Sequence, residues 1–299
     1  MIFGQYQRHL SHTQRALSDL LKQARAALGE CALELRATGS GAINLAKALG
    51  IPFVQEVVAV AQALERVAPQ VDVAIELGGE DAKIIYFKGG LEERMNGVCA
   101  GGTGSFIDQM AALLQTDASG LDREAAHYQQ IYPIAARCGV FAKTDIQPLI
   151  NQGAKAGDVA ASIFYAVVNQ TIAGLAQGRK IGGNVLYLGG PLTFLPQLKK
   201  SFDKTLGVTG TCPENSLYFV ALGAALCSSG AAQNLLAMTS SHFCAAERQF
   251  RTPLSYGAVR TPTAQWTATA AGCCLLRPAG QGVGIAAATF GRVQDYNIK

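Results

Sequence analysis

"VDVAIELGGEDAKIIYFKGG" (residues 71–90) is the stretch that says most about the architecture of this chain. Two apolar runs rich in β-branched and aromatic residues flank the turn "GGED" (78–81), and a second turn, "KGG" (88–90), follows the second run. Runs of this kind, bounded by glycine turns, are typical of paired strands. The stretch therefore predicts a β-hairpin or meander whose first strand ends in a Gly-Gly pair.

A second Gly-Gly pair, in "GNVLYLGG" (183–190), closes another apolar run that we predict to be a buried strand. Glycine carries no Cβ, so a Gly-Gly pair at a strand end lets the backbone approach a neighbouring group closely. Either pair alone is most simply an ordinary turn. Taken together, the acid-rich first pair and the apolar second pair suggest the two halves of a nucleotide clamp.

Segments with helical periodicity alternate with short strand-like segments up to about residue 230, which predicts an α/β architecture. Asp158 is placed to cap the longest helix. Beyond this point the periodicity fades, and we predict a poorly patterned tail (231–299) that is disordered or aberrant. Helices are predicted at 11–28, 41–50, 56–68, 101–115, 121–130, 141–153, 156–179, 191–207 and 216–230, and further strands at 31–39, 51–55 and 208–212.

Composition limits the classes of function. The chain has 299 residues and a net charge of +4, and residues 1–230 hold 19 basic and 19 acidic side chains, so we expect no nucleic-acid partner. No apolar run approaches the ~20 residues of a membrane span, and the first residues lack the apolar region of a signal peptide. We therefore expect a cytoplasmic protein without a membrane partner, whose eight cysteines form no disulfide framework.

Two of these cysteines each precede a predicted helix. Cys99 lies before the glycine-rich turn of "NGVCAGGTGSF" (96–106), and Cys138 lies in "RCGVFAKTD" (137–145). Unpaired N–H groups and the positive end of a helix dipole favour a thiolate at such positions, and the thiolate is the form that binds metal. From the residues alone, two metal ligands and two ordinary buried thiols remain equal alternatives.

The order of these signals resembles one family, the ATP-dependent activators of 2-hydroxyacyl-CoA dehydratases, which are related to the ATPase subunits of benzoyl-CoA reductase. "IELGGEDAK" and "RCGVFAKTD" are most similar to activator modules of very large, multi-module members, whereas small activators have Gln where Glu80 stands. The matching segments are "TGSG" (38–41), "ELGGEDAKII" (76–85), "NGVCAGGTGSF" (96–106), "RCGVFAKTDIQPLINQGA" (137–154), "LYLGGPL" (186–192) and "ALGAAL" (221–226).

The resemblance covers roughly residues 5–230 and implies the two-lobe, ribonuclease H-like α/β fold of the acetate kinase, sugar kinase, Hsp70 and actin superfamily. It implies an activator-type ATPase module over 1–230, with a first lobe at about 1–95 and a second lobe at about 96–230. The small residues of "ALGAAL" suit close helix packing.

The resemblance also implies a metal site. Cys99 and Cys138 match the family's ligands to a 4Fe–4S cluster, and two ligands per chain require a homodimer that shares the cluster on its two-fold axis. Gly101, Gly102 and Gly104 would let the backbone fold closely around this group. Zinc shared across a dimer is a lesser alternative.

The nucleotide site implied by the resemblance uses ATP and Mg²⁺. Gly78 and Gly79 would lie against the β and γ phosphates. Glu76 and Asp81 would hold Mg²⁺ through water or orient the attacking water. Lys83 is a phosphate contact or, equally, a solvent-facing strand residue. The remaining residues implied to bind cofactor are Glu80, Gly189 and Gly190.

One family motif, the first phosphate loop D-x-G-S/T-T-x-x-K on an N-terminal hairpin, does not occur in the sequence. Its absence implies a first lobe without its opening strands and with an exposed sheet edge. The main hypothesis is an ATP-hydrolysing activator that passes one electron to a dehydratase-like or CoA-reductase-like iron–sulfur protein, provided that the missing loop is supplied or dispensable. The alternatives are a truncated, catalytically impaired fragment that binds the cluster or nucleotide, and a small-molecule kinase, which the cysteine motifs disfavour.

Overall fold

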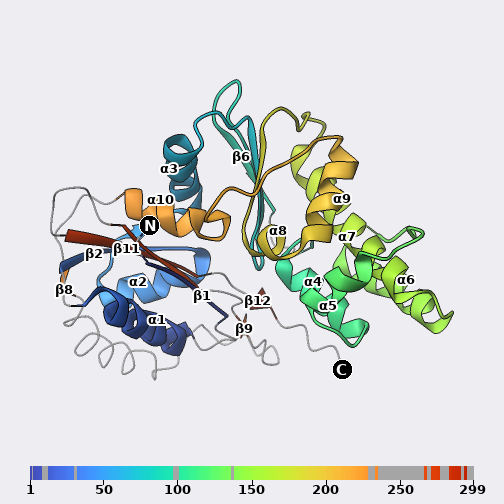
Figure 1. Ribbon diagram of the computed structural model, residues 1–299, viewed down its shortest axis with the longest axis horizontal. Coiled ribbons are helices and arrows are strands. Elements are labelled where there is room, and N and C mark those ends of the chain that lie inside the picture. The colour runs from blue at the N-terminus through green and yellow to red at the C-terminus, as the bar shows by residue number, and fades with distance from the viewer. Residues whose placement is uncertain are drawn as a thin grey trace, which may run out of the picture. The chain divides into compact units, whose positions relative to one another are not determined.

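The structure is a computed structural model that divides into two compact units, each with its own sheet (Figure 1). Unit 1 comprises Met1–Pro69 and Tyr218–Lys299, and unit 2 comprises Gln70–Leu217. The described residues are 1, 3–8, 13–29, 32–96, 101–135 and 138–227, with the strand segments 233–234, 266–267, 271–276, 283–290 and 293–294.

Unit 2 is built on a four-stranded sheet in the order β6-β5-β4-β7. β4 (Val73–Leu77), β5 (Ala82–Tyr86) and β6 (Glu92–Met95) form an antiparallel meander, and β7 (Val185–Leu188) pairs parallel to β4. The meander predicted from 71–90 is confirmed. Every residue of β4, β5 and β7 is buried, as expected for strands covered on both faces.

Helices cover the sheet of unit 2 and complete its core. Tyr187, Phe164 and Phe202 are the largest fully buried side chains, and they come from β7 and two of these helices. The helices of unit 2 are α4 (Gly104–Leu113), α5 (Ala118–Ala125), α6 (Gly139–Asn151), α7 (Ala156–Thr171), which continues as the π-helical turn η2 (Ile172–Ala176), α8 (Gly190–Phe194) and α9 (Pro196–Leu206).

Helix α7 with its π-helical turn, Ala156–Ala176, passes a test of length and composition for a membrane span, alone among the helices of the described residues. From the sequence we expected no apolar run near the length of a membrane span, and that expectation overlooked this segment. However, 72% of its apolar window is buried inside the unit, which is the environment of a core helix.

The start of α7 departs from the prediction that Asp158 caps it. The N-cap is Lys155, and Asp158 is 2% exposed, within the first turn. Its Oδ1 accepts hydrogen bonds from the backbone N–H groups of Gln129 (2.6 Å) and Gln130 (3.1 Å). Asp158 therefore anchors the irregular segment around Gln129 and Gln130 to α7, because its carboxylate accepts from backbone N–H groups that no helix or strand pairs.

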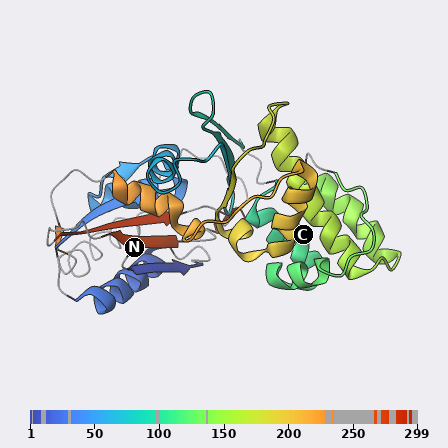
Figure 2. The same cartoon turned by 45° about the horizontal axis from the view of Figure 1, so that its top comes forward.

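The main sheet of unit 1 combines strands from both ends of the chain. Its order is β1-β10-β11-β2-β3, and the views in Figures 1 and 2 place the red C-terminal strands between the blue N-terminal ones. Its strands are β1 (Phe3–Gln7), β2 (Ala32–Thr38), β3 (Phe53–Val54), β10 (Ala271–Leu276) and β11 (Val283–Phe290), with β8 (Gln233–Asn234) against β2, while β9 (Trp266–Thr267) and β12 (Val293–Gln294) form a separate pair.

This sheet differs from the expectation for the tail. β11 pairs parallel to β2 along its length, and β10 pairs antiparallel to both β11 and β1. The tail thus places two strands at the centre of the sheet, where the sequence predicted missing inner strands. β1 and β2 meet only through them, because each uses a tail strand as its neighbour.

The helices of unit 1 include one very close crossing. A Cβ built on Gly223 of α10 would overlap the carbonyl of Ala59 in α3. Only glycine permits this approach, so the close packing expected for "ALGAAL" is confirmed. The helices are α1 (Thr13–Leu28), α2 (Ile43–Leu49), α3 (Glu56–Val67) and α10 (Phe219–Leu226), with the 3₁₀ turn η1 (Ser40–Ala42), while the 3₁₀ turn η3 (Ser216–Tyr218) spans the boundary between the units.

The division into units differs from the lobe boundary expected near residue 95. That position falls at the end of β6, inside unit 2. The reason is strand pairing, because β4 carries the whole meander and forms its parallel ladder with β7 of the same unit.

Candidate functional site

Three glycine-rich segments of unit 2 meet at one edge of its sheet. β4 and β7 are parallel neighbours, so their carboxyl ends lie together, and this is the edge at which open α/β sheets bind ligands. The turn "GGED" follows β4, Gly189 follows β7, and α4 begins nearby at Gly104. Hydrogen bonds and close backbone contacts join all three segments.

The first glycine turn is closed by its own backbone and by Asn96. The N–H of Gly78 donates to the carbonyl of Asp81, with an N–O distance of 2.7 Å. Asn96 Oδ1 accepts from the N–H of Ala82 (2.7 Å), and its Nδ2 donates to the carbonyl of Glu80 (3.0 Å). Asn96 therefore holds the shape of this turn.

The start of α4 is docked on the same turn. The N–H groups of Gly104 and Ser105 donate to the carbonyls of Gly78 (2.9 Å) and Gly79 (2.8 Å). A Cβ on Gly104 would lie 3.2 Å from the Gly78 oxygen, closer than ordinary contact allows. Two of the N–H groups that helix starts leave unpaired are satisfied in this way, and the turn and the helix are held as one piece.

Gly189 brings the end of β7 against the end of β4. Its φ is +85°, and a Cβ there would overlap the carbonyl of Leu77. Its N–H donates to the carbonyl of Ser216 (3.2 Å), and Gly190 is the first residue of α8. Gly189 is thus required by contact with protein backbone, and the contacts of Gly189 and Gly190 with a nucleoside stay a prediction.

The charged residues of the segment occupy different environments. Glu76 and Lys83 face each other across β4 and β5, and their Oε2 and Nζ atoms are 3.5 Å apart. Lys83 is 2% exposed and Glu76 is 6% exposed, so the alternative that Lys83 faces solvent is wrong. Glu80 and Asp81, in the turn itself, are half-buried. As whole residues the turn acids are more exposed than Glu76, although Glu80 Oε1 is itself buried.

Cys138 is half-buried and forms the N-cap of α6, where its side chain makes no capping hydrogen bond. Its carbonyl accepts from the N–H of Ala142 (2.9 Å), which begins the helix. A Cβ on the next residue, Gly139, would lie 3.3 Å from the ring of Phe106, in the first turn of α4. The start of α6 therefore packs against the start of α4.

Cys99, the other predicted ligand, lies outside the described residues, and the description resumes at Gly101. A Cβ on Gly101 would lie 3.0 Å from Gln170 Oε1, and one on Gly102 would lie 3.0 Å from Thr171 Oγ1. Both glycines are thus needed for contact with the end of α7. Gln170 is 8% exposed, and its carboxamide has no hydrogen-bond partner among the described residues.

A metal ion held within one chain needs several ligand side chains close together. In the part of the chain that the structure describes, no three His, Cys, Asp or Glu side chains cluster closely enough to hold a metal. The assignment of Cys99 and Cys138 as metal ligands stays a prediction.

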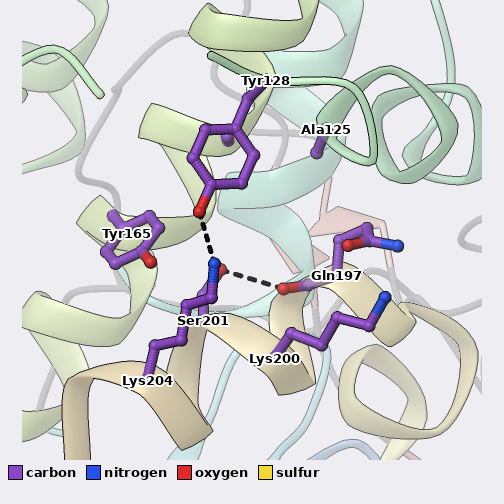
Figure 3. Close-up of a pocket in the computed structure, with 8 residues that line it drawn as sticks. Ala125, Tyr128, Tyr165, Gln197, Lys200, Ser201 and Lys204 are labelled. Carbon is purple, nitrogen blue, oxygen red and sulfur yellow. Dashed lines mark hydrogen bonds between the residues drawn. The ribbon is translucent and has the colours of Figure 1, made fainter. Parts of the chain in front are cut away.

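A separate small pocket lies between α7 and α9 (Figure 3). Lys204 Nζ donates to the hydroxyl of Tyr128 (2.6 Å), and this hydrogen bond lowers the pKa of Tyr128, while burial raises the pKa of the neighbouring Tyr165. Lys204 reaches in between the rings and leaves a cavity of about 20 Å³, enough for a water molecule. The pocket therefore contributes nothing to the glycine-rich site.

Sequence reasoning missed Asn96, Phe106 and Gln170. Asn96 stands before Gly97, and Asn-Gly is a turn signal from which its role could have been expected. Gln170 interrupts an apolar helix at a position whose neighbours are buried, which marks a polar group with a task. Phe106 carried no signal, because a buried aromatic in the first turn of a helix is usually core.

Comparison with known proteins places the chain among the expected ATPases. Residues 5–228 match the model of the BadF/BadG/BcrA/BcrD ATPase family. The (R)-2-hydroxyglutaryl-CoA dehydratase activating ATPase of Acidaminococcus fermentans is 30% identical over 214 residues, which cover 71% of this chain and 81% of the relative.

Solved structures agree with this match. The crystal structure of the Acidaminococcus fermentans (R)-2-hydroxyglutaryl-CoA dehydratase component A has a TM-score of 0.61 at 29% identity, covering 71% of this chain and 81% of the other. The activator of the 2-hydroxyisocaproyl-CoA dehydratase from Clostridium difficile with bound ADPNP has a TM-score of 0.61 at 24% identity, covering 78% and 83%. The expected two-lobe α/β fold is confirmed.

The C-terminal third is similar to a different protein. Residues 201–299 match the model of Stage V sporulation protein AD. The Bacillus subtilis protein of that name is 40% identical over 89 residues, which cover 30% of this chain and 26% of the relative. The tail that fails to resemble the activators therefore has relatives of its own.

Proposed function

The chain belongs to the BadF/BadG/BcrA/BcrD ATPase family, and we propose that it is an ATP-dependent iron–sulfur activator of a 2-hydroxyacyl-CoA dehydratase or a related CoA-substrate reductase. One relative is the activating ATPase of such a dehydratase, and two more are activators of such dehydratases. The observation that carries the proposal is the packing of Gly139 on Phe106, because it brings the helix after Cys138 to the helix that follows Cys99.

Cys99 and Cys138 are the proposed ligands of a 4Fe–4S cluster shared by a homodimer. Cys138 is the N-cap of α6, and Cys99 precedes α4 in the sequence, so each chain offers two sulfur ligands. Val140 and Phe141, two and three residues after Cys138, are 59% and 64% exposed. A second copy would cover these apolar side chains while supplying the other two ligands.

The glycine-rich edge of unit 2 is the proposed ATP site. Gly78 and Gly79 lie in a turn that Asn96 and α4 hold in place, which suits a rigid phosphate contact. Asp81 is proposed to hold Mg²⁺ through water or to orient the attacking water, since it lies in the turn. Glu76 is proposed as the second carboxylate, and its pairing with Lys83 positions that ammonium beneath the turn.

In this proposal ATP binds two conformations of the dimer unequally and so shifts their populations. Cys99 and Cys138 would hold the cluster, which when bound would supply a low-potential electron for an iron–sulfur protein of the dehydratase or CoA-reductase class. Such a role belongs in the cytoplasm.

Anaerobic reconstitution with iron and sulfide tests the metal site. We expect a brown dimer with about one cluster per two chains, and loss of iron and colour in Cys99→Ala and Cys138→Ala. Cys212→Ala is the matched control, because Cys212 is exposed and lies elsewhere in unit 2. A wild-type protein that takes up zinc but no iron would contradict the assignment of a 4Fe–4S cluster.

ATP hydrolysis decides between an activator and an impaired fragment. We expect Mg²⁺-dependent turnover by the wild-type protein that falls by about 10²-fold or more in Asp81→Asn. Asp108→Asn, in α4 away from the turn, serves as the control. Iron uptake without any turnover would favour the fragment, whose sequence lacks the first phosphate loop.

A further inference from the structure

The pocket between α7 and α9 contains a tyrosine whose phenol is bound by an ammonium group (Figure 3). Tyr128 follows α5 and is half-buried, and its hydroxyl accepts a hydrogen bond of 2.6 Å from Nζ of Lys204. Lys204 lies in the last turn of α9, where the negative end of the helix dipole favours a cation. Its pKa is raised, chiefly by the hydrogen bond to Tyr128, so this ammonium stays charged.

The ammonium makes Tyr128 a better nucleophile than a phenol in an apolar environment. A positive neighbour favours the phenolate, and the phenolate is the form that attacks electrophiles. The pKa of Tyr128 is lowered, first by the hydrogen bond from Lys204 and then by the neighbouring hydroxyl of Tyr165. Burial instead raises the pKa of Tyr86, Tyr165 and Tyr187. Tyr128 is therefore the most readily ionised of these four phenols.

Tyr132, four residues further along the chain, is a natural comparison for Tyr128. It is also half-buried, and its hydroxyl accepts from Nε2 of Gln130. A carboxamide is a neutral donor, whereas a hydrogen bond from an ammonium is charge-assisted and about twice as strong. Tyr128 and Tyr132 thus form a matched pair in one segment, and the charge of the donor is what separates them.

The backbone on both sides of the pocket holds this pair in place. A Cβ built on Gly157 would lie 2.9 Å from the carbonyl oxygen of Glu124 and 3.6 Å from the backbone nitrogen of Tyr128, so the end of α5 packs closely on the start of α7. Beside Lys204, Asp203 accepts from the hydroxyl of Tyr187, with an O–O distance of 2.9 Å. The phenol and the ammonium are therefore preorganised.

The surroundings of the phenol indicate which electrophile suits it. Two exposed ammonium groups, from Lys200 and Lys204, line the pocket, and no carboxylate belongs to the described lining. Such a surface attracts anions. The cavity beside the phenol measures about 20 Å³, the space of one water molecule. These features suit a small acyl group that arrives on an anionic leaving group.

We propose that Tyr128 is a covalent acceptor of small acyl groups from acyl phosphates. The phenol oxygen attacks the carbonyl carbon and forms an ester bond, the carbon–oxygen bond to phosphate breaks, and phosphate leaves with the phenol proton. Nothing is oxidised or reduced in this transfer. Lys204 would also stabilise the negative charge that develops on the carbonyl oxygen. The site uses no residue proposed to bind ATP or a metal, so it does not depend on the proposed function.

Acetyl phosphate is the probe for this site. The full-length protein is treated at neutral pH, and acetylated peptides are identified by mass spectrometry before and after hydroxylamine, which cleaves a tyrosine ester but leaves a lysine amide. We expect a hydroxylamine-sensitive acetyl group on Tyr128 that forms about tenfold faster than one on Tyr132, and its loss in Tyr128→Phe. Acetylation of lysines alone, or equal rates on Tyr128 and Tyr132, overturns the inference.

Variants of Lys204 test the part played by the ammonium. Lys204→Met should form the ester about tenfold more slowly, whereas Lys204→Arg keeps the charge and should retain most of the rate. Lys143→Met, at an exposed position of α6, is the control and should leave the rate unchanged. Melting curves identify any variant that misfolds. A folded Lys204→Met protein that forms the ester at the wild-type rate would overturn activation by Lys204.

Discussion

Unit 2 draws its whole sheet from one continuous stretch, 70–217, whereas unit 1 draws its sheet from residues at both ends of the chain. The meander of unit 2 joins neighbours in sequence, and its one long-range ladder, β4 with β7, is locked by Gly189. In unit 1, β1 and β2 depend on partners more distant in sequence. The sheet of unit 2 is therefore stabilised by pairing within one stretch of the chain, whereas the sheet of unit 1 depends on strands from the tail.

Removal of residues 231–299 is expected to have the largest effect, because it should destabilise unit 1 and leave unit 2 intact. Unit 1 would lose β10 and β11, so β2 would lose its long parallel ladder and the small core beneath it would open. Amide exchange in β2 should accelerate by about a hundredfold or more, while exchange in β4 and β5 stays slow. Hydrogen-exchange mass spectrometry measures both in one sample, and equal acceleration in the two units would contradict the separation.

Glycine-to-alanine substitutions are expected to have the next largest effects. Gly189→Ala should cost about 4 kcal/mol, because it combines a left-handed φ with overlap on Leu77. Gly223→Ala should cost about 3 kcal/mol through overlap with Ala59 in unit 1. Gly207→Ala, at φ +65° with nothing within 4 Å, should cost only about 1 kcal/mol. Urea unfolding monitored for each unit separately would measure these differences.

Among the described residues, a buried ion pair lies in each unit, and these pairs sharpen the comparison. Glu76 and Lys83 join two strands of unit 2, whereas Glu34 and Arg36, 2.6 Å apart, lie on the same strand of unit 1. Lys83→Met should cost about 3 kcal/mol, because it strands a buried carboxylate.

The double variant Glu76→Leu/Lys83→Met provides the control. It should recover most of the stability lost in Lys83→Met, because it removes both charges together. A single variant no less stable than the double one, by chemical denaturation, would show that the pair has no such coupling.

The smallest effect is expected for Asp158→Asn. The amide retains an oxygen that accepts from Gln129 and Gln130, but it loses the charge. Those hydrogen bonds lower the pKa of Asp158 below its ordinary 3.8, so its contribution is complete above that value and is lost as the pH falls through the folded pKa. The stability difference between wild type and variant should therefore stay constant near neutral pH and shrink in acid, which melting curves from pH 7 to pH 3 would follow.

The local parts of the fold were predictable because their signals are local. The meander follows from turn glycines between β-rich runs, and Glu76 and Lys83 are equally far from the turn centre, so hairpin register already sets them opposite each other. What the sequence did not reveal was their burial, since strand "AKIIY" is covered on both faces by helices distant in the chain.

The tail strands were not predictable by the same reasoning. Their Ala-, Gly- and Thr-rich segments carry weak periodicity, and their place in a sheet depends on partners at the other end of the chain. The buried, unpaired amide of Gln170 was likewise hidden, because its surroundings come from segments distant in the chain. The roles of the two cysteines and of the phosphate turn remain predictions of the family relationship.

The tail-supplied strands of unit 1 also have a consequence for the order of events during synthesis. Domains generally fold as their residues emerge from the ribosome. All of unit 2 has been made by residue 217, whereas the sheet of unit 1 cannot close until Phe290 has followed. The first 69 residues would therefore wait, with their apolar face uncovered, while unit 2 folds behind them. A chaperone that shields nascent apolar surface should act on this protein chiefly through its N-terminal segment.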